Sequence, residues 1–418
     1  MVEGRRGLGR AFANLFTANL ASSLGDGIAR VAAPLLATRL TDDPFLVAAV
    51  AAVAMLPWLL VAIPAGILID RVDRRHALAV SNSVRTVLAL ALVALTWTDR
   101  LTIAWLLAVV FLYGVLETVY DGAIRAVVPS VVARPDLHRA NSRIEGGEQA
   151  VQSFFAAPVT SWLFATAVVA PLALNAAAYL LAAVLAFLLP AAAAGTHRTQ
   201  TTGPAVRWYR QLVDGFRFIR SSRMLLRLWL LSSVTGVCFS AATATWVVFV
   251  LDRLEVPEAW FGTVMLSGAV GGVLATFAVS PLAARFGTGR AMAVANLVAC
   301  GVLVVVGAVP VLWVAVLGFA VTSGALTVWN VLVVSLRQSL IPSRLLGRVH
   351  GTWRTLLWGS MPLGSVLGGL LARIDLTTPL VVGGGAATIV GLVWFRFLAQ
   401  LPDPTDVEPE AAPDTVGS

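Results

Sequence analysis

The sequence predicts an all-α membrane protein with twelve transmembrane helices in two pseudo-symmetric six-helix halves. The first indication is composition: 58% of the 418 residues are hydrophobic, only 12% are charged, and the mean hydropathy is +0.84. A water-soluble globular protein does not need that much apolar surface. The second is the recurrence of apolar stretches of about 20 residues, the length that crosses a bilayer as a helix. Helices are expected because each backbone polar group in lipid must be satisfied within its own segment.

Twelve spans follow one another along the chain and are joined by short polar loops. We place them at residues 11–40, 44–70, 76–98, 101–131, 141–166, 168–192, 223–251, 257–285, 287–310, 312–340, 345–373 and 376–399. The two halves look like weak internal repeats, because residues 280–285 keep the Leu and the Arg of residues 66–71. Internal repeats of this kind are common in transporter folds.

The basic residues indicate the orientation of the spans. All 30 are Arg, and they concentrate in alternate loops. The Arg-rich loops hold Arg5, Arg6 and Arg10; Arg71, Arg74 and Arg75; Arg134, Arg139 and Arg143; Arg285 and Arg290; Arg337, Arg344 and Arg348. Short Arg-rich loops mark the cytoplasmic side, so both termini are expected there. Arg without Lys suggests a GC-rich bacterial genome and therefore the inner membrane. We expect the Arg residues that give the net charge of +8 to contact membrane lipids and not nucleic acid.

A division of the chain is expected at residues 193–222. Its first part, residues 195–204, is polar, and its second part predicts an amphipathic helix on the inner membrane surface, with a simple polar linker as the alternative. The apolar residues at helical spacing are Trp208, Leu212, Phe216 and Ile219. The predicted organisation is a six-helix half (1–192), a cytoplasmic linker (193–222), a second six-helix half (223–400) and a disordered acidic tail (401–418).

The loop between the second and third spans carries a specific motif. Six residues match the pattern Gly-x-Leu-x-Asp-Arg-x-Gly-Arg-Arg, and Asp73 stands where the pattern has Gly. The matching residues are Gly66, Leu68, Asp70, Arg71, Arg74 and Arg75. The loop resembles that of major facilitator superfamily transporters, and the resemblance covers nearly the whole chain. It implies a gating motif made by Gly66, Asp70, Arg71, Arg74 and Arg75. In family members, the Asp matching Asp70 contacts the start of the eleventh helix, here residues 351–354, which suits a latch on the inner gate.

Two shorter segments resemble the enterobactin-exporter and macrolide-efflux branch of that superfamily. They are Leu346-Gly347-Arg348-Val349 after the tenth span and Leu24-Gly25-Asp26-Gly27 in the first. The fifth span departs from the pattern of exporters. Exporters carry a Gly-rich stretch ending in Gly-Pro there, whereas this chain has Phe155-Ala156-Ala157-Pro158.

Ionisable residues inside spans point to function, because each costs about 2.5 kcal/mol or more at mid-bilayer unless it is paired or hydrated. The first span holds Asp26 and Arg30, and the fourth holds Glu117, Asp121 and Arg125. Spacings of four residues place each set on one helix face. At 1.5 Å per residue, Asp26 and Glu117 both fall near the middle of their helices. The resemblance implies that these two helices line a central cavity, where the acidic faces would meet.

This arrangement suggests a proton-coupled carrier. We predict Asp26 and Glu117 to be the protonatable sites, with Asp121, Arg30 and Arg125 tuning them, because a nearby Arg opposes the effect of burial on a carboxylate. The alternative is that Asp26–Arg30 and Asp121–Arg125 are permanent ion pairs that hold helices together.

Arg85, in the third span, is expected to be structural and to pair with Asp70 or Asp73. The second half offers polar and aromatic candidates for substrate binding but almost no charge. These candidates are Phe239, Thr243 and Trp246 in the seventh span and Thr322, Trp329 and Asn330 in the tenth. The last three form an i, i+7, i+8 stripe, although such aromatic stripes more often serve packing.

The sequence therefore predicts a secondary active transporter, working by alternating access and exporting a lipophilic drug, siderophore or secondary metabolite in exchange for protons. A proton-coupled importer of a small nutrient and a non-transporting receptor or scaffold remain alternatives. We expect no enzyme activity, cofactor or metal. The four His residues all fall in loops or in the linker, and without Lys there is no phosphate-binding loop.

Overall fold

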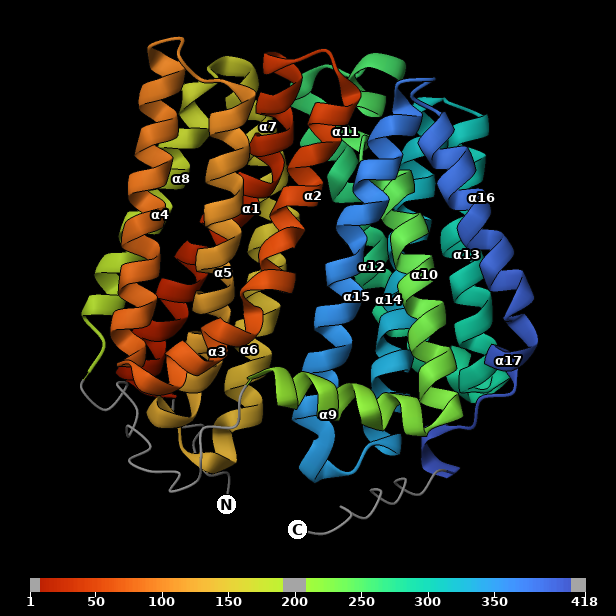
Figure 1. Ribbon diagram of the computed structural model, residues 1–418. Helices are drawn as coiled ribbons and strands as arrows, with labels where there is room; N and C mark the ends of the chain where they lie inside the picture. Colours follow the sequence, from red (N-terminus) through yellow and green to blue (C-terminus); the bar gives the residue numbers. More distant parts are fainter. Residues whose placement is uncertain (1–7, 191–207, 407–418) are drawn as a thin grey trace, which may run out of the picture. The chain divides into compact units, whose positions relative to one another are not determined.

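A computed structural model describes residues 8–190 and 208–406 of the chain (Figure 1). The side chains of residues 62, 63, 67, 70, 71, 134, 208–212, 343, 344 and 347 lie outside this description. The described residues form helices joined by short turns and contain no β-strand. Eight helices are long and apolar enough to cross a membrane on their own, and two shorter apolar helices accompany them.

The helices of the first half correspond to the first six predicted spans. They are α1 (Arg10–Leu40), α2 (Pro44–Leu60), α3 (Ala62–Arg71), α4 (Arg74–Trp97), α5 (Ile103–Val131), α6 (Leu137–Gln149), a π-helical segment η2 (Ala150–Ala156), α7 (Ala157–Thr166) and α8 (Val169–Phe187). The second predicted span is thus made by α2 with α3, and the fifth by α6, η2 and α7.

The second half begins with a short helix and continues with the last six predicted spans. Its elements are α9 (Trp208–Ser221), α10 (Arg223–Thr243), α11 (Trp246–Val248), a π-helical segment η4 (Phe249–Arg253), α12 (Glu258–Phe286), α13 (Thr288–Ala308), α14 (Leu312–Leu340), α15 (Ser343–Ala372), α16 (Thr378–Val393) and α17 (Phe395–Ala399). The seventh predicted span comprises α10, α11 and η4.

Proline explains two of the interruptions. Pro64 has no N–H to donate to Leu60, and the second span breaks between α2 and α3 at Val61, one turn before it. Pro158 stands at the start of α7, and the turns before it widen into the π-helical segment η2. A π-bulge accommodates the ring of a proline that would otherwise clash with the preceding turn.

The chain forms two compact units. Unit 1 holds Met1–Asp42, Leu56–Pro204 and Pro257–Thr263, and unit 2 holds Asp43–Met55, Ala205–Val256 and Val264–Ser418. Each unit therefore includes a short segment from the other half of the sequence. Ion pairs join these segments to their units. Arg39 Nη2 lies 2.6 Å from Glu258 Oε2 in unit 1, and Arg373 Nη2 lies 2.5 Å from Asp43 Oδ2 in unit 2.

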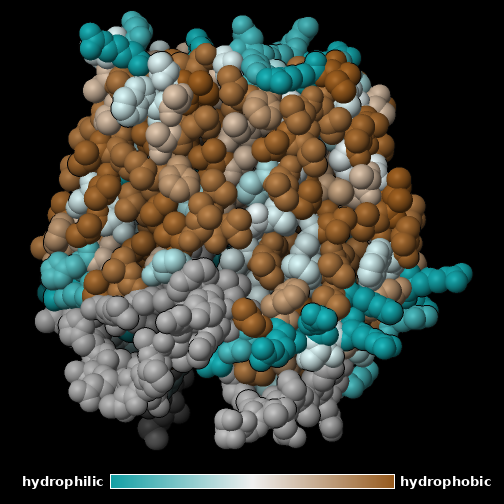
Figure 2. Space-filling model, in the orientation of Figure 1, coloured by the Kyte–Doolittle hydropathy of each residue, from teal (hydrophilic) through white to brown (hydrophobic). Residues whose placement is uncertain are grey.

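Large apolar side chains cover the outward faces of the helices (Figure 2). Val87 on α4, Phe277 on α12 and Leu367 on α15 each expose half or more of their surface. In Figure 2 the hydrophilic residues gather near the ends of the helices. Apolar helix faces of this length match a bilayer interior, as expected for a multi-pass membrane protein.

The helix α9 occupies the predicted amphipathic segment but packs against protein. Phe218 and Ile219 are buried in a core cluster with Leu225 and Leu228 of α10, and Gly215 lies against Thr352 of α15. Arg217 and Arg220 are exposed on another face. The polar segment 195–204 lies outside the described residues, as does the tail from residue 407.

Carboxylates cap two helices at their N-termini. Asp73 accepts hydrogen bonds from the backbone N–H and the guanidinium of Arg75 at the start of α4, and these bonds lower the pKa of Asp73. Asp403 accepts from the backbone N–H of Thr288 at the start of α13, which lowers the pKa of Asp403 as well. Both carboxylates also face the positive end of a helix dipole.

Candidate functional site: a buried polar network in unit 1

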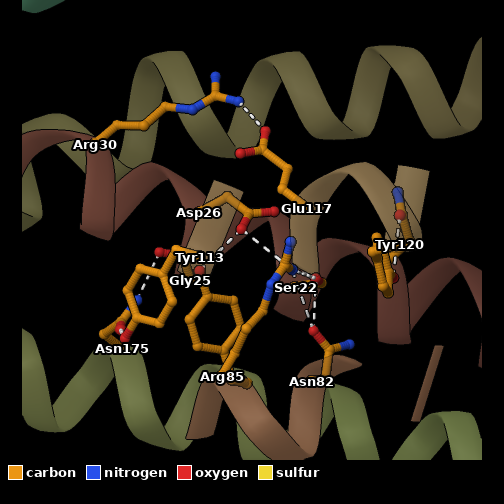
Figure 3. A network of polar contacts seen from close by, with 12 residues as sticks. Ser22, Gly25, Asp26, Arg30, Asn82, Arg85, Tyr113, Glu117, Tyr120 and Asn175 are labelled. Atoms are coloured by element: carbon orange, nitrogen blue, oxygen red, sulfur yellow. Dashed lines mark hydrogen bonds and ion pairs between the residues drawn. The ribbon is translucent and has the colours of Figure 1, made fainter. Parts of the chain in front are cut away.

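Asp26 lies near the middle of α1 and faces α8 and α4. Its Oδ1 accepts a hydrogen bond of 2.9 Å from the hydroxyl of Tyr179 on α8 and lies 3.3 Å from Nη1 of Arg85 on α4 (Figure 3). The neighbouring Gly25 makes this approach possible. A β-carbon at Gly25 would meet the Tyr179 ring at 2.5 Å, and the Gly25 carbonyl accepts from Asn175 Nδ2 at 2.6 Å.

Arg85 is completely buried, with none of its side chain exposed. Besides Asp26, its Nη1 donates to Ser22 Oγ at 3.3 Å and to Asn82 Oδ1 at 3.4 Å. Its guanidinium carbon lies 5.5 Å from the centre of the Tyr120 ring and 5.3 Å from that of Tyr179. The prediction that Arg85 pairs with Asp70 or Asp73 is therefore wrong. Arg85 balances the charge of Asp26.

Two of the Arg85 nitrogens, Nε and Nη2, have no hydrogen-bond partner among the described residues. A guanidinium stays charged at any physiological pH, so it cannot relieve the penalty of burial by losing its proton. A buried cation with incomplete hydrogen bonding is costly, so Arg85 depends on its carboxylate partner Asp26. The cost of burying Arg85 therefore depends on whether Asp26 is ionised or protonated.

Glu117 on α5 pairs with Arg30 of α1. Arg30 Nη2 lies 2.6 Å from Glu117 Oε1, and Arg30 Nη1 donates to Gln152 Oε1 of η2 at 3.1 Å. More than half of the Arg30 side chain is exposed, in contrast to Arg85. Arg30 of α1 and Glu117 of α5 thus meet, and the expectation that these faces line a central cavity stays a prediction. Arg30 bonds to Glu117 on the neighbouring helix, whereas the alternative weighed from the sequence was a permanent ion pair with Asp26 on its own helix.

Asp121 and Arg125 lie apart from that group. They line a cavity of about 240 Å³ between α5 and α6, together with Glu145 and Glu148 of α6. Arg125 is exposed, and Asp121 is partly buried. The five residues predicted for proton coupling therefore fall into two places. Asp26, Arg30 and Glu117 lie around the Arg85 network, and Asp121 and Arg125 lie at the cavity.

Several participants in the network were not predicted. Tyrosine is rare in the chain, and three of its four copies are here. The participants that were not predicted are Asn19, Ser22, Asn82, Tyr113, Tyr120, Asn175 and Tyr179. One signal in the sequence could have found some of them. Asn19, Ser22, Asp26 and Arg30 recur every three or four residues, which makes a polar stripe on an otherwise apolar helix.

The predicted gating motif is only partly described. Arg74 Nη1 donates to the carbonyl of Ala126 on α5 at 2.9 Å, and Arg75 pairs with Asp73 at 2.8 Å. Gly66 faces open space. The side chains of Asp70 and Arg71 lie outside the described part, so the latch between Asp70 and residues 351–354 stays a prediction.

The predicted substrate residues of the second half have different surroundings. Trp246 is buried and stacks on Phe319, with 5.2 Å between ring centres. Thr243 donates to the carbonyl of Phe239, one turn earlier in α10. Both Phe239 and Thr243 are partly buried.

The tenth-span stripe on α14 is split between packing and surface. Thr322 is buried and donates to the carbonyl of Ala299 on α13, and Trp329 belongs to the hydrophobic core of unit 2. Asn330 is exposed. The part of these residues in substrate binding stays a prediction.

Comparison with known proteins places the chain in a family. The sequence profile of the family described as "transmembrane secretion effector" matches residues 8–414. No curated protein matches the chain by sequence.

Three solved structures share the fold at low sequence identity. A POT family transporter in complex with 5-aminolevulinic acid has a TM-score of 0.75 at 12% identity, covering 96% of this chain and 98% of that one. A bacterial homologue of the iron transporter ferroportin, in an inward-facing state, has a TM-score of 0.73 at 18% identity, with coverage of 94% and 100%. The nucleoside transporter NupG has a TM-score of 0.72 at 13% identity, also with 94% and 100%. The chain belongs to the transmembrane secretion effector family and is a membrane transporter of the major facilitator type.

Proposed function

We propose that the protein is a proton-coupled exporter that works by alternating access, and that Asp26 carries the coupled proton. The observation behind this proposal is the ion pair between Asp26 and the fully buried Arg85, supported by the Tyr179 hydroxyl. An acid buried in a membrane segment is tolerated only with a partner or with water. The balance between its ionised and protonated forms therefore depends on both.

The pair supplies a two-state element. With Asp26 ionised, the two charges attract and Arg85 is held between α1 and α4. With Asp26 protonated, the attraction is lost and Arg85 keeps only its bonds to Ser22 and Asn82 and its two aromatic neighbours. A carrier needs such a difference so that the proton favours one conformation over the other.

Glu117 is proposed as a second protonatable site. Its partner Arg30 exposes more than half of its side chain. A change of conformation that separates Arg30 from Glu117 would break this ion pair. We propose that Arg30 tunes Glu117 in this way, while Asp121 and Arg125 act at the neighbouring cavity.

The description of the family favours export, since its members are named for secretion. The small number of buried charges in the second half favours a lipophilic compound, such as a drug, siderophore or secondary metabolite. Asn330 and the partly buried Phe239 and Thr243 are the proposed contacts, with Trp246, Thr322 and Trp329 behind them. The Arg distribution favours a bacterial inner membrane with both termini in the cytoplasm.

Inverted membrane vesicles test this function. Cells expressing the chain and control cells supply the vesicles, and a panel of lipophilic amines, macrolides and siderophores supplies the substrates. An exporter accumulates at least one compound inside the vesicles when a proton gradient is imposed, and an uncoupler abolishes the accumulation. Accumulation that survives the uncoupler contradicts proton coupling. Uptake in right-side-out vesicles alone would identify an importer instead.

A further inference from the structure

Glu148 links the cavity between α5 and α6 to the interior of unit 1. Its side chain lines the cavity of about 240 Å³. Its Oε1 also accepts a hydrogen bond of 2.8 Å from Nδ2 of Asn19 on α1. Asn19 is completely buried, so the bond fixes the amide inside the helix bundle. Glu148 therefore has one face in a cavity lined by charged and apolar side chains and one face on the buried network.

A continuous set of contacts runs from Asn19 to Asp26. The hydroxyl of Tyr120 donates to Asn19 Oδ1 at 3.3 Å. The ring of the same Tyr120 lies below the guanidinium of Arg85, 5.5 Å from its centre. Arg85 Nη1 then lies 3.3 Å from Asp26 Oδ1. Figure 3 shows Tyr120, Arg85 and Asp26 in this order.

We propose that Glu148 is a positioning residue whose charge state is transmitted to the Asp26–Arg85 pair through Asn19 and Tyr120. This inference rests on the proposed function, because it names the group that regulates the proposed proton site. The protonation state of Glu148 would set how readily Asp26 releases its proton.

The sign of the effect follows from polarisation along the contacts. An ionised Glu148 makes a charge-assisted bond with Asn19, which is stronger than a neutral one. Hydrogen bonds in a chain polarise one another. The Tyr120 oxygen and ring become more negative, and Arg85 is drawn to the ring at the expense of Asp26. Ionised Glu148 therefore favours the protonated form of Asp26, and neutral Glu148 favours the ionised form.

Other charged groups also face Glu148. Asp121 and Arg125 approach it from α5, and Glu145 lies on its own helix. From α1 the neighbour is the amide of Asn19. The opposite charges of Asp121 and Arg125 offset each other in part. Glu145 gives a matched control, because it is an exposed carboxylate on the same helix and at the same cavity.

The test is an infrared titration of the full-length protein in lipid nanodiscs, with isotope-labelled Asp and with Asp26→Asn used to assign the Asp26 band. Four proteins make a cycle: wild type, Glu148→Gln, Tyr120→Phe and the double variant. Tyr120→Phe keeps the ring below Arg85 and removes only the hydroxyl. We expect Glu148→Gln to lower the pH midpoint of Asp26 by about 0.4 to 1 pH unit in the wild-type background, and by less than half as much in the Tyr120→Phe background.

Three results would overturn the inference. They are no shift with Glu148→Gln, the same shift in both backgrounds, and an equal shift with Glu145→Gln. The last two results would mean that the charge of a cavity carboxylate acts on Asp26 directly through space and not through Asn19 and Tyr120. The titration needs no substrate, so it is independent of the transport assay. If wild type transports without a proton requirement while the titration behaves as expected, the proposed function fails and the coupling of Glu148 to Asp26 stands.

Discussion

Asp26 and Arg85 differ in how each tolerates the loss of the other. Without Arg85, Asp26 can take up a proton and become neutral. Without a carboxylate at position 26, Arg85 remains a buried cation, because a guanidinium does not lose its proton. We therefore expect Asp26→Asn to destabilise the protein by roughly 3 kcal/mol. Denaturant unfolding in a mild detergent, followed by tryptophan fluorescence, measures this difference.

The control for this prediction is the double variant Asp26→Asn with Arg85→Gln. It removes both charges, so no unpaired ion is left in the interior. It should recover more than half of the stability lost by Asp26→Asn alone. A double variant that is no more stable than the single one would show that the two side chains do not depend on each other.

Glu117→Gln should behave differently from Asp26→Asn. Its partner Arg30 exposes more than half of its side chain, so the loss of stability should stay below about 1 kcal/mol. Proton-coupled transport should nevertheless be abolished, because Gln cannot take up and release the proton. Transport by reconstituted variant protein, compared with its unfolding curve, checks both parts. Normal coupled transport by the variant would exclude Glu117 as a proton site.

At the scale of single residues, the sequence singled out the two acids Asp26 and Glu117 but not which arginine pairs with each of them. Asp26 and Glu117 were singled out because a carboxylate in an apolar helix is costly wherever the helix lies. The alternative ion pair between Asp26 and Arg30 rested on a spacing of four residues, which shows only which side chains share a face. Arg30 turns to Glu117 on α5, and Arg85 reaches Asp26 from α4. Those choices depend on the rotation of three helices relative to one another, which the spacing within one helix does not contain.

At the scale of elements, Gly25 sets the distance between α1 and α8. A β-carbon there would overlap the Tyr179 ring, so Gly25→Ala should push the helices apart and destabilise the protein by about 1 to 3 kcal/mol. Gly385→Ala on α16 is the control, because its β-carbon would meet open space and alanine favours the helix. Thermal unfolding compares the two. Equal stability of both variants would mean that α1 and α8 do not need the close approach.

The lowered pKa of Asp73 predicts how the stability of the protein depends on pH. Its pKa lies below the ordinary value of about 3.9, so its stabilising effect is fully present above that value and is lost as the pH falls through the lower pKa of the folded state. Asp73→Ala should cost about 1 kcal/mol at neutral pH through the lost helix cap. The difference from wild type should shrink below about pH 4. Unfolding measured at neutral and acidic pH tests this. A difference that does not change with pH would show that the charge is irrelevant.

The limits of most helices followed from the sequence because the ends of apolar stretches are set by charged and turn-forming residues. The interruptions within spans were not predicted. Pro64 and Pro158 were visible, but how a proline is accommodated depends on the packing around it. In the fifth span the chain widens into a π-helical segment, and this brings Gln152 within 3.1 Å of Arg30. The same segment also packs against Gly27 of α1.

At the scale of the whole molecule, composition and hydropathy were enough for the twelve-span fold, because bilayer thickness sets the length of each apolar stretch that crosses it. The loop motif then indicated the superfamily. The branch within it did not follow, because segments of four residues are short and the fifth span departs from the exporter pattern. The exchanged segments Asp43–Met55 and Pro257–Thr263 were also not predicted, because they depend on contacts between distant parts of the chain.

The most direct test of proton coupling at Asp26 is substrate-driven proton movement in proteoliposomes that contain a pH-sensitive dye. A compound identified in the vesicle screen supplies the gradient, and the Asp26→Asn, Arg85→Gln double variant is compared with wild type. Wild type should move protons when the substrate gradient is imposed. The double variant should still exchange labelled for unlabelled substrate but move no protons. Proton movement by the double variant at the wild-type ratio to substrate would contradict the account.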